Sequence, residues 1–174
     1  PYFTWSDPGD SGSGISYYQG SINDGAPSTV SSGYHPTWIS GTYTFKVRAV
    51  DGAGSSSGWS NIITIKIDDT APSAVALSSP TSGTAMTDTT PTFQWNPATD
   101  AHSGIASYTF QTDTSTTFDS GNLRTISGIL TTSYTVDVAL SIGTWYWHVL
   151  AVDNAGNPGS YSAYWSLIIS PVSI

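Results

Sequence analysis

The sequence contains no cysteine and no glutamate, and only four of its 174 residues are lysine or arginine. Without cysteine, the fold has neither disulfides nor thiolate metal sites. With 12 aspartates the formal net charge is -8. This shortage of basic residues argues against nucleic acid as a partner, because phosphate binding needs cations to displace counterions. No run approaches the roughly 18 apolar residues of a membrane span, so direct membrane insertion is not expected.

What the chain does contain is 29 serines, 24 threonines, 17 glycines and 10 prolines. This mixture is poor in helix formers and rich in residues that favour strands and turns. Seven tryptophans and ten tyrosines supply enough apolar area for packed cores, so the polar richness does not indicate disorder. The composition therefore predicts an all-β protein.

A repeat runs through the chain. AVDGAG at positions 49–54 returns as AVDNAG at 151–156, an offset of 102, and the strand-like segment before each copy aligns at the same offset. Nearer the N-terminus, PYFTW at 1–5 aligns with PTFQW at 91–95 at an offset of 90. A repeat of this length matches the size of one β-sandwich module, so the sequence predicts two homologous domains in tandem.

The two offsets differ by 12, which places a net insertion of 12 residues in the second copy, between Tyr108 and Gly143. Such insertions are usually accommodated in loops or hairpins at the edge of a sheet.

The alternation of apolar and polar residues before each AVD motif predicts a half-buried strand. Its outward positions differ between copies. They are Thr44, Lys46 and Arg48 in the first, and Tyr146, His148 and Leu150 in the second. This more apolar face indicates that the second domain is covered, by its own insertion or by a neighbour.

Four motifs occur in order in the second copy and in the segment that precedes it. They are DDTAP (68–72), PTFQW (91–95), DAHSGIASY (100–108) and GTWYWHVLAVDNAGN (143–157). In this order they resemble tandem fibronectin type III or immunoglobulin-like domains of large bacterial and archaeal extracellular proteins. The resemblance implies two tandem immunoglobulin-like antiparallel β-sandwiches, at residues 1–67 and 74–174, joined by a linker at 68–73. It places Trp5 and Trp95 on strand B, Tyr18 and Tyr108 on strand C, and Val47 and Val149 on strand F.

The second copy has a candidate for strand A at Ala74–Leu77, whereas the first copy begins at Pro1 already in strand B. The first sandwich is therefore expected to lack its strand A and to have an unpaired edge. Two alternatives stay open. The strand lies in sequence before Pro1, or another segment or subunit supplies it by β-augmentation. The tail Pro171–Ile174 is one possible donor, in a filament.

In the fold that the resemblance implies, the B–C loop, the F–G loop and the incoming linker share one pole of a domain. For the second domain this gathers Asp68, Asp69, Asp100, Asp153 and Asn154, and oxygen ligands from three segments suit an interdomain calcium ion. No cofactor is otherwise required. The alternative is that these residues cap turns through their side-chain oxygens.

Tyr34 and Trp38 fall near predicted loops, where aromatic rings can stack on sugars; the alternative is that they fill the core. No G-x-S-x-G motif or helix supports a hydrolase, so we expect no enzyme. The resemblance implies a non-catalytic structural or adhesive module of an extracellular or cell-surface protein, acting as spacer, stalk or fibre segment beside neighbouring copies or domains. Two alternatives are an accessory or carbohydrate-binding module of a secreted polysaccharide-degrading enzyme, with glycans as ligands, and a filament subunit that uses strand donation.

Overall fold

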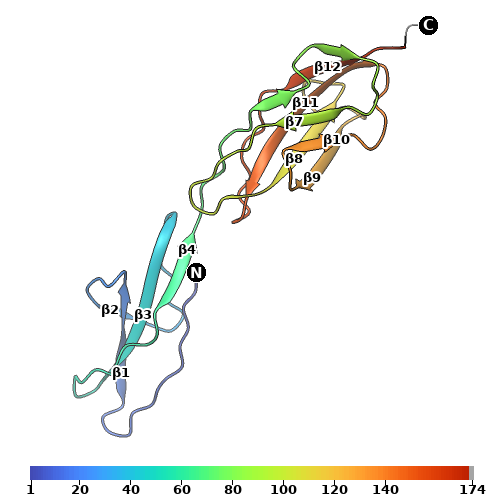
Figure 1. Ribbon diagram of the computed structural model, residues 1–174. Coiled ribbons are helices and arrows are strands. Elements are labelled where there is room, and N and C mark those ends of the chain that lie inside the picture. The colour runs from blue at the N-terminus through green and yellow to red at the C-terminus, as the bar shows by residue number, and fades with distance from the viewer. Residues whose placement is uncertain (173–174) are drawn as a thin grey trace. The chain divides into compact units, whose positions relative to one another are not determined.

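The computed structural model describes residues 1–172 of the chain (Figure 1). The described residues form strands and turns, and among them is no helix long and apolar enough to cross a membrane. The chain folds as two compact units, Pro1–Asp68 and a second that starts at Asp69. The predicted all-β fold class is confirmed. Of the proposed donor tail Pro171–Ile174, the last two residues lie outside the described part of the chain.

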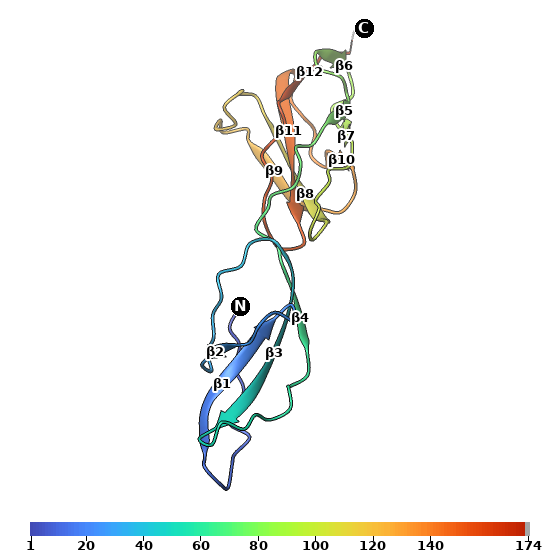
Figure 2. The same ribbon diagram turned by 90° about the vertical axis from the view of Figure 1, so that its left-hand side faces the viewer.

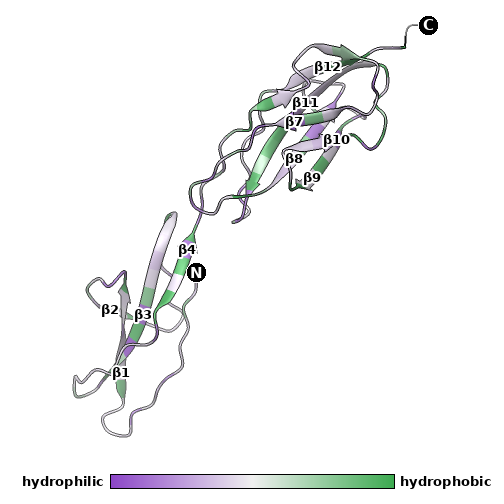
Figure 3. Ribbon diagram, viewed as in Figure 1, coloured by the Kyte–Doolittle hydropathy of each residue, from purple (hydrophilic) through white to green (hydrophobic). Residues whose placement is uncertain are grey.

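The first unit contains one antiparallel sheet with the strand order β2-β1-β3-β4. Its strands are β1 (Ile15–Ile22), β2 (Ser28–Val30), β3 (Gly41–Asp51) and β4 (Ile63–Ile67). Apolar and polar residues alternate along β4, as the bands of colour in Figure 3 show. Within the described residues, β4 pairs only with β3 and is one edge of the sheet.

The segment Pro1–Trp5, predicted as strand B of the first sandwich, is not a regular strand. Phe3 forms an isolated bridge with Tyr34, and its ring packs 4.4 Å from that of Phe45. The segment is thus anchored by aromatic contacts and a single bridge. A ladder needs a partner strand with a matching row of hydrogen-bonding groups, and the described part of the first unit offers this segment only one such contact.

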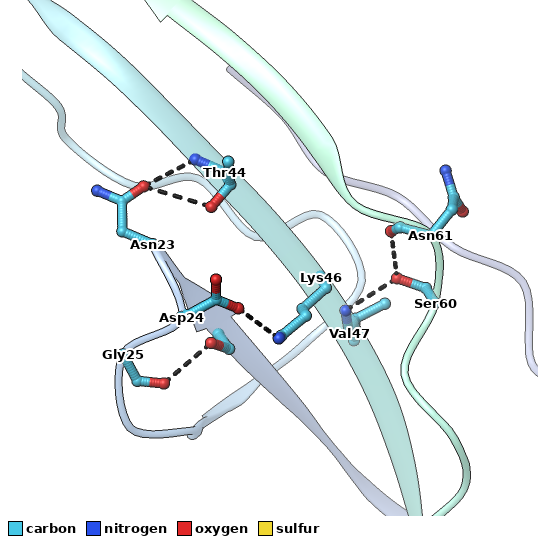
Figure 4. A network of polar contacts seen from close by, with 9 residues as sticks. Asn23, Asp24, Gly25, Thr44, Lys46, Val47, Ser60 and Asn61 are labelled. Carbon is cyan, nitrogen blue, oxygen red and sulfur yellow. Dashed lines mark hydrogen bonds and ion pairs between the residues drawn. The ribbon is translucent and has the colours of Figure 1, made fainter.

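Polar contacts fix the turn between β1 and β2 (Figure 4). Asn23 and Asp24 have positive φ values of 51° and 56°, which Asn and Asp tolerate better than most residues. Asn23 Oδ1 accepts a hydrogen bond from the Thr44 amide at 2.8 Å, and Lys46 pairs with Asp24 at 2.5 Å. The hairpin is therefore tied to the outward face of β3.

The second unit is a complete sandwich of two sheets, β10-β7-β5 and β6-β12-β11-β8-β9 (Figure 2). Its strands are β5 (Leu77–Ser79), β6 (Thr84–Met86), β7 (Thr92–Trp95), β8 (Ile105–Asp113), β9 (Arg124–Ile129), β10 (Ser133–Thr135), β11 (Gly143–Asp153) and β12 (Trp165–Ile169). All pairings are antiparallel except that of β6 with β12.

Strand β11 shows the predicted alternation most clearly. Its inward side chains are at most 2% exposed: Trp145, Trp147, Val149 and Ala151. The Trp147 ring lies 4.8 Å from Phe93 of the opposite sheet, so aromatic contacts join the two layers. Because this face removes large rings from water, it contributes to the hydrophobic stabilisation of the unit.

The predicted strand A of the second unit, Ala74–Leu77, is only partly a strand. β5 begins at Leu77, and the residues before it are held by separate bonds, such as the Asn96 amide donating to the Ala76 carbonyl at 2.8 Å. Val75 is nevertheless 5% exposed and belongs to the core. Isolated bonds to an irregular loop keep the segment in place without forming a ladder.

The pairing registers locate the 12 extra residues of the second copy. Tyr18 opposite Val30 leaves a separation of 12 residues, whereas Tyr108 opposite Ile129 leaves 21. Nine of the extra residues therefore enlarge the β8–β9 hairpin. From this hairpin, Phe118 stacks on His148 at 3.6 Å between ring centroids, with planes 8° apart. The expectation that the insertion covers the outward face of the second domain is thus confirmed.

Candidate metal centre

The AVD motif ends a strand and caps the turn after it in both units. Asp51 Oδ1 accepts hydrogen bonds from the amides of Ala53 (2.9 Å) and Ser55 (2.8 Å). Asp153 Oδ1 accepts from Ala155 (2.9 Å) and Asn157 (2.8 Å) in the same way. The glycine of each DxAG turn has a φ near +90°, 87° at Gly54 and 92° at Gly156, which a side chain would strain. Turn capping is therefore one role of both aspartates.

The loop that leads into β8 is organised by a second aspartate. Asp100 Oδ1 accepts hydrogen bonds from the amides of His102 (3.1 Å), Ser103 (2.8 Å) and Gly104 (2.9 Å). Asn154, which follows Asp153, donates from Nδ2 to the carbonyl of Ser103 at 2.8 Å. These bonds hold the loop before β8 against the loop after β11.

Three of the aspartates predicted to bind calcium come together. Asp68, Asp100 and Asp153 each offer a carboxylate oxygen, and these oxygens lie within 4.8 Å of one another. Asp153 is only 1% exposed, and the other two are half-buried. Three carboxylates at this spacing repel one another, and burial makes the repulsion more costly. A divalent cation that prefers oxygen ligands would offset both costs, and Ca²⁺ is such a cation.

The other two predicted members take different positions. Asp69 does not belong to this group of three, although it adjoins Asp68. The Asn154 amide group is turned toward the carbonyls of Ser103 and Gly104, so it positions the loops instead of joining the group.

Sequence reasoning missed Asn157. Its Nδ2 donates to Asp153 Oδ2 at 2.8 Å and to the Thr70 carbonyl at 3.2 Å, which links the turn to the segment before β5. A signal existed in the repeat, because Asn157 stands where the first copy has Ser55 in an otherwise similar turn. This hydrogen bond fixes the orientation of the Asp153 carboxylate in the group.

In the first unit, Asp10 and Asp51 are the counterparts of Asp100 and Asp153. They line a hollow of about 240 Å³, and Asp10 binds the amides of Gly12 and Gly14 through its two oxygens. Among the described residues, no third acidic side chain joins them. The described part of the first unit therefore offers counterparts of Asp100 and Asp153 but no counterpart of Asp68.

The aromatic residues considered for glycan contacts both take part in ring packing. Trp38 stacks on Tyr43 at 4.4 Å with planes 12° apart, and Tyr34 stacks on Phe45 at 5.9 Å with planes 20° apart. Both side chains are half-buried. One ring face of each is thereby covered by the protein.

No family model and no curated protein matches the sequence. Among solved structures, the FN1–FN3 domains of chicken CNTN1 match with a TM-score of 0.54 and 14% identity, over 87% of this chain and 55% of that one. The fibronectin(III)-like modules of Clostridium thermocellum CbhA match over 97% of this chain and 83% of that one, with 17% identity and a TM-score of 0.48. A Fn3-like protein from Clostridium thermocellum shares 24% identity over 59% of this chain and 95% of its own, with a TM-score of 0.38.

The likeness to the CNTN1 domains confirms the predicted fold. The chain has a tandem fibronectin III-like, immunoglobulin-like fold, in which the described residues of the second unit form a two-sheet sandwich and those of the first form one sheet. Because this fold carries many unrelated activities, function has to be argued from the sites themselves.

Proposed function

We propose that the chain is a non-catalytic spacer segment of an extracellular surface protein, and that calcium fixes the connecting residue Asp68 to the second unit. The observation that carries this proposal is the gathering of Asp68, Asp100 and Asp153 oxygens within 4.8 Å. Asp68 belongs to the connecting segment directly before Asp69, Asp100 precedes β8, and Asp153 ends β11. An ion held by all three would tie the connecting backbone to the other two positions.

The number and kind of ligands suit an extracellular location. Calcium affinity depends on the number of charged ligands and on the rigidity of the site, and extracellular calcium modules bind with dissociation constants of about 10⁻⁴–10⁻³ M. Such weak sites fill only where calcium is in the millimolar range. At saturation, the ion adds stability to the unit that binds it, in proportion to the logarithm of its concentration over the dissociation constant.

The neighbouring residues Asp68 and Asp69 provide a matched test. Asp68→Asn removes one carboxylate of the group, whereas Asp69→Asn removes the same charge one residue away, outside the group. Isothermal titration of the full chain with CaCl₂ should show binding near millimolar. We expect Asp68→Asn to weaken that binding about tenfold or more and Asp69→Asn to leave it unchanged.

Small-angle scattering of the same samples tests the mechanical part of the proposal. Calcium should narrow the distribution of end-to-end distances of the wild-type chain and leave that of Asp68→Asn unchanged. Absence of binding and of any shift in melting temperature at 10 mM (about ten times the expected dissociation constant) would remove the calcium proposal. If Asp69→Asn weakened calcium binding as much as Asp68→Asn, the proposed set of three calcium ligands would be wrong.

A glycan-binding function has less support. Trp38 and Tyr34 have one ring face each covered by Tyr43 and Phe45, and both are half-buried, which leaves little free platform for stacking on a sugar. Retention on insoluble polysaccharide that is lost in Trp38→Ala would favour that alternative over the spacer.

A further inference from the structure

Two Asp-Gly sequences occur in the chain, Asp24-Gly25 and Asp51-Gly52, and both belong to the first unit. Because glycine has no side chain, its amide nitrogen can approach the carboxyl carbon of the aspartate before it with little hindrance. Asp-Gly is for this reason the sequence in which aspartate isomerises most readily. The second copy has Asn154 at the position of Gly52, so its AVD turn lacks the sequence.

The isomerisation is intramolecular and needs neither an enzyme nor a cofactor. The glycine amide nitrogen forms a bond to the side-chain carboxyl carbon of the aspartate. The C–OH bond of the protonated carboxyl breaks, and the hydroxyl and the amide proton leave together as water. The resulting cyclic imide (succinimide) is opened by addition of water. Opening restores aspartate or gives isoaspartate, in which the main chain passes through the former side-chain methylene and is longer by that group.

The fold restrains the carboxylate of Asp51. Its Oδ1 accepts hydrogen bonds from the amides of Ala53 (2.9 Å) and Ser55 (2.8 Å), and the residue is half-buried. The amide of Gly52 donates to the carbonyl of Gly14 at 3.0 Å. Turning the carboxyl group toward the Gly52 nitrogen would break both bonds of the cap, so the folded unit opposes the reaction at this position.

The carboxylate of Asp24 has weaker restraints. Its side chain is 72% exposed and forms a surface ion pair with Lys46 at 2.5 Å (Figure 4). Such pairs are easily opened, because water competes for both charges. The Gly25 amide donates to the Ile22 carbonyl at 2.8 Å, so the reacting nitrogen is hydrogen-bonded here as it is at Gly52. The two sites therefore differ in their carboxyl groups and not in their amides.

We propose that Asp24 is a site of spontaneous isomerisation to isoaspartate, and that the turn around Asp51 protects that residue. The modified residue has a carboxylate attached directly to Cα, and its longer backbone displaces the turn in which Asn23 accepts the Thr44 amide at 2.8 Å. Within the described residues, β2 (Ser28–Val30) pairs with β1 alone. Isomerisation therefore loosens this strand, and it involves none of the aspartates of the candidate metal centre.

The test is prolonged incubation of the full chain at mildly acidic pH, followed by mass spectrometry with electron-transfer fragmentation, which distinguishes isoaspartate from aspartate at each position. We expect isoaspartate to accumulate at Asp24 about tenfold faster or more than at Asp51, because the cap of Asp51 must open first. Amides of Ser28–Val30 should exchange with deuterium faster in the aged protein than in the fresh one. The second unit is the internal reference.

Two glycine variants form a matched pair. An alanine Cβ at Gly25 would lie 3.0 Å from the Ile22 carbonyl oxygen, and one at Gly52 would lie 3.0 Å from the Ser13 carbonyl oxygen. The two substitutions thus meet similar crowding. Gly25→Ala should slow the reaction at Asp24, because the added methyl group hinders the nitrogen, whereas Gly52→Ala should leave it unchanged.

Urea separates the effect of the fold from that of the sequence. In the unfolded chain the two Asp-Gly sites should react at similar rates. If the unfolded chain formed isoaspartate at both positions while the folded chain formed none at Asp24, the proposal would be wrong. Equal accumulation at both positions in the folded chain would contradict the protection of Asp51. Isoaspartate at Asp24 without faster exchange of β2 would contradict the loosening of that strand.

Discussion

In the second unit Trp95 and Val149 are closed into a core, at 3% and 0% exposure, whereas Trp5 and Val47 in the first unit are half-buried and line an open groove. The two tryptophans occupy equivalent places in the repeat and contact equivalent tyrosines, at ring distances of 5.5 Å in the first unit and 5.6 Å in the second. The immediate neighbours are thus alike, and the difference comes from segments distant in sequence. Closure of a sandwich depends on what covers its open side, as well as on the residues of its sheets.

The outward faces differ as well. In the first unit Trp59 lies against two cations, 4.7 Å from the Arg48 guanidinium and 5.2 Å from the Lys46 ammonium. At the corresponding place in the second unit Tyr161 stacks on neutral His148 at 4.0 Å, and Phe118 covers the other face of the imidazole. Here a hairpin insertion has replaced a solvated charged face by a stack of three rings.

The largest contrast is expected from the paired tryptophans. Trp95→Ala should cost about 3–5 kcal/mol of the stability of the second unit, because it empties a closed core. Trp5→Ala should cost less than half as much, because one side of the ring already faces the groove. Urea unfolding of the full chain, with hydrogen exchange to assign each transition, measures both. Equal losses would show that Trp5 is as well covered as Trp95.

Removal of the ring that covers His148 should have the next largest effect. Phe118→Ala is expected to lower the stability of the second unit by about 2 kcal/mol, from lost apolar burial and lost stacking. It should also move the pKa of His148 up from about 4 toward its ordinary value of 6.5, because water reaches the imidazole. Calorimetry and an NMR titration of the His148 ring protons give the two values. Leu123→Ala, in the same hairpin and 37% exposed, is the control.

Acid should distinguish the two units. Burial lowers the pKa of His148 to about 4, whereas the same group titrates near 6.5 when unfolded. Between these values the unfolded chain binds more protons than the folded one, so stability is full above about pH 6.5 and is lost as the pH falls toward 4. The first unit has Lys46 instead of a histidine at the equivalent position. Between pH 7 and pH 4 the melting temperature of the second unit should fall less in His148→Gln than in the wild-type chain. An identical fall in both proteins would show that other groups cause the pH dependence.

The smallest effect is expected on the charged face of the first unit. Trp59→Leu should cost about 1 kcal/mol, since cation–π contacts at partly exposed sites are worth roughly 0.5–1 kcal/mol each. Trp59→Phe keeps an aromatic face and should retain part of that energy. Urea midpoints of the first transition measure the difference. If the Trp59→Leu and Trp59→Phe proteins were equally stable, Trp59 would stabilise the first unit only through buried apolar area and not through cation–π contacts.

The repeat predicted the fold well where the pattern is local. Alternation identified β3 and β11, and the offsets identified the insertion that the structure places largely in the β8–β9 hairpin. The strand predicted at Pro1–Trp5 was wrong, although the same pattern forms β7 in the second unit. β7 has β5 and β10 as neighbours, and a ladder depends on such distant partners, which the local pattern does not contain.

For the candidate site, the sequence predicted aspartates from three segments, and the structure brings Asp68, Asp100 and Asp153 together. It could not decide between Asp68 and Asp69, because the direction of each side chain depends on backbone angles in an irregular segment. The hydrogen bonds that Asn154 and Asn157 donate to carbonyl and carboxylate oxygens could not be predicted from the sequence either. Which partner an amide group finds depends on distances that only the folded loops define.

The parallel pairing of β6 with β12 determines how the second unit would respond to tension. Thr84, Ala85 and Met86 lie opposite Leu167, Ile168 and Ile169. A force applied to the amino end of the unit and to the carboxyl end of β12 first detaches the short β5. It then pulls β6 and β12 in opposite directions along their length. All the hydrogen bonds of the pair are then sheared together, whereas a hairpin pulled at its open end would lose them one after another. Under load, the rate of forced unfolding would therefore depend on this one short pair of strands.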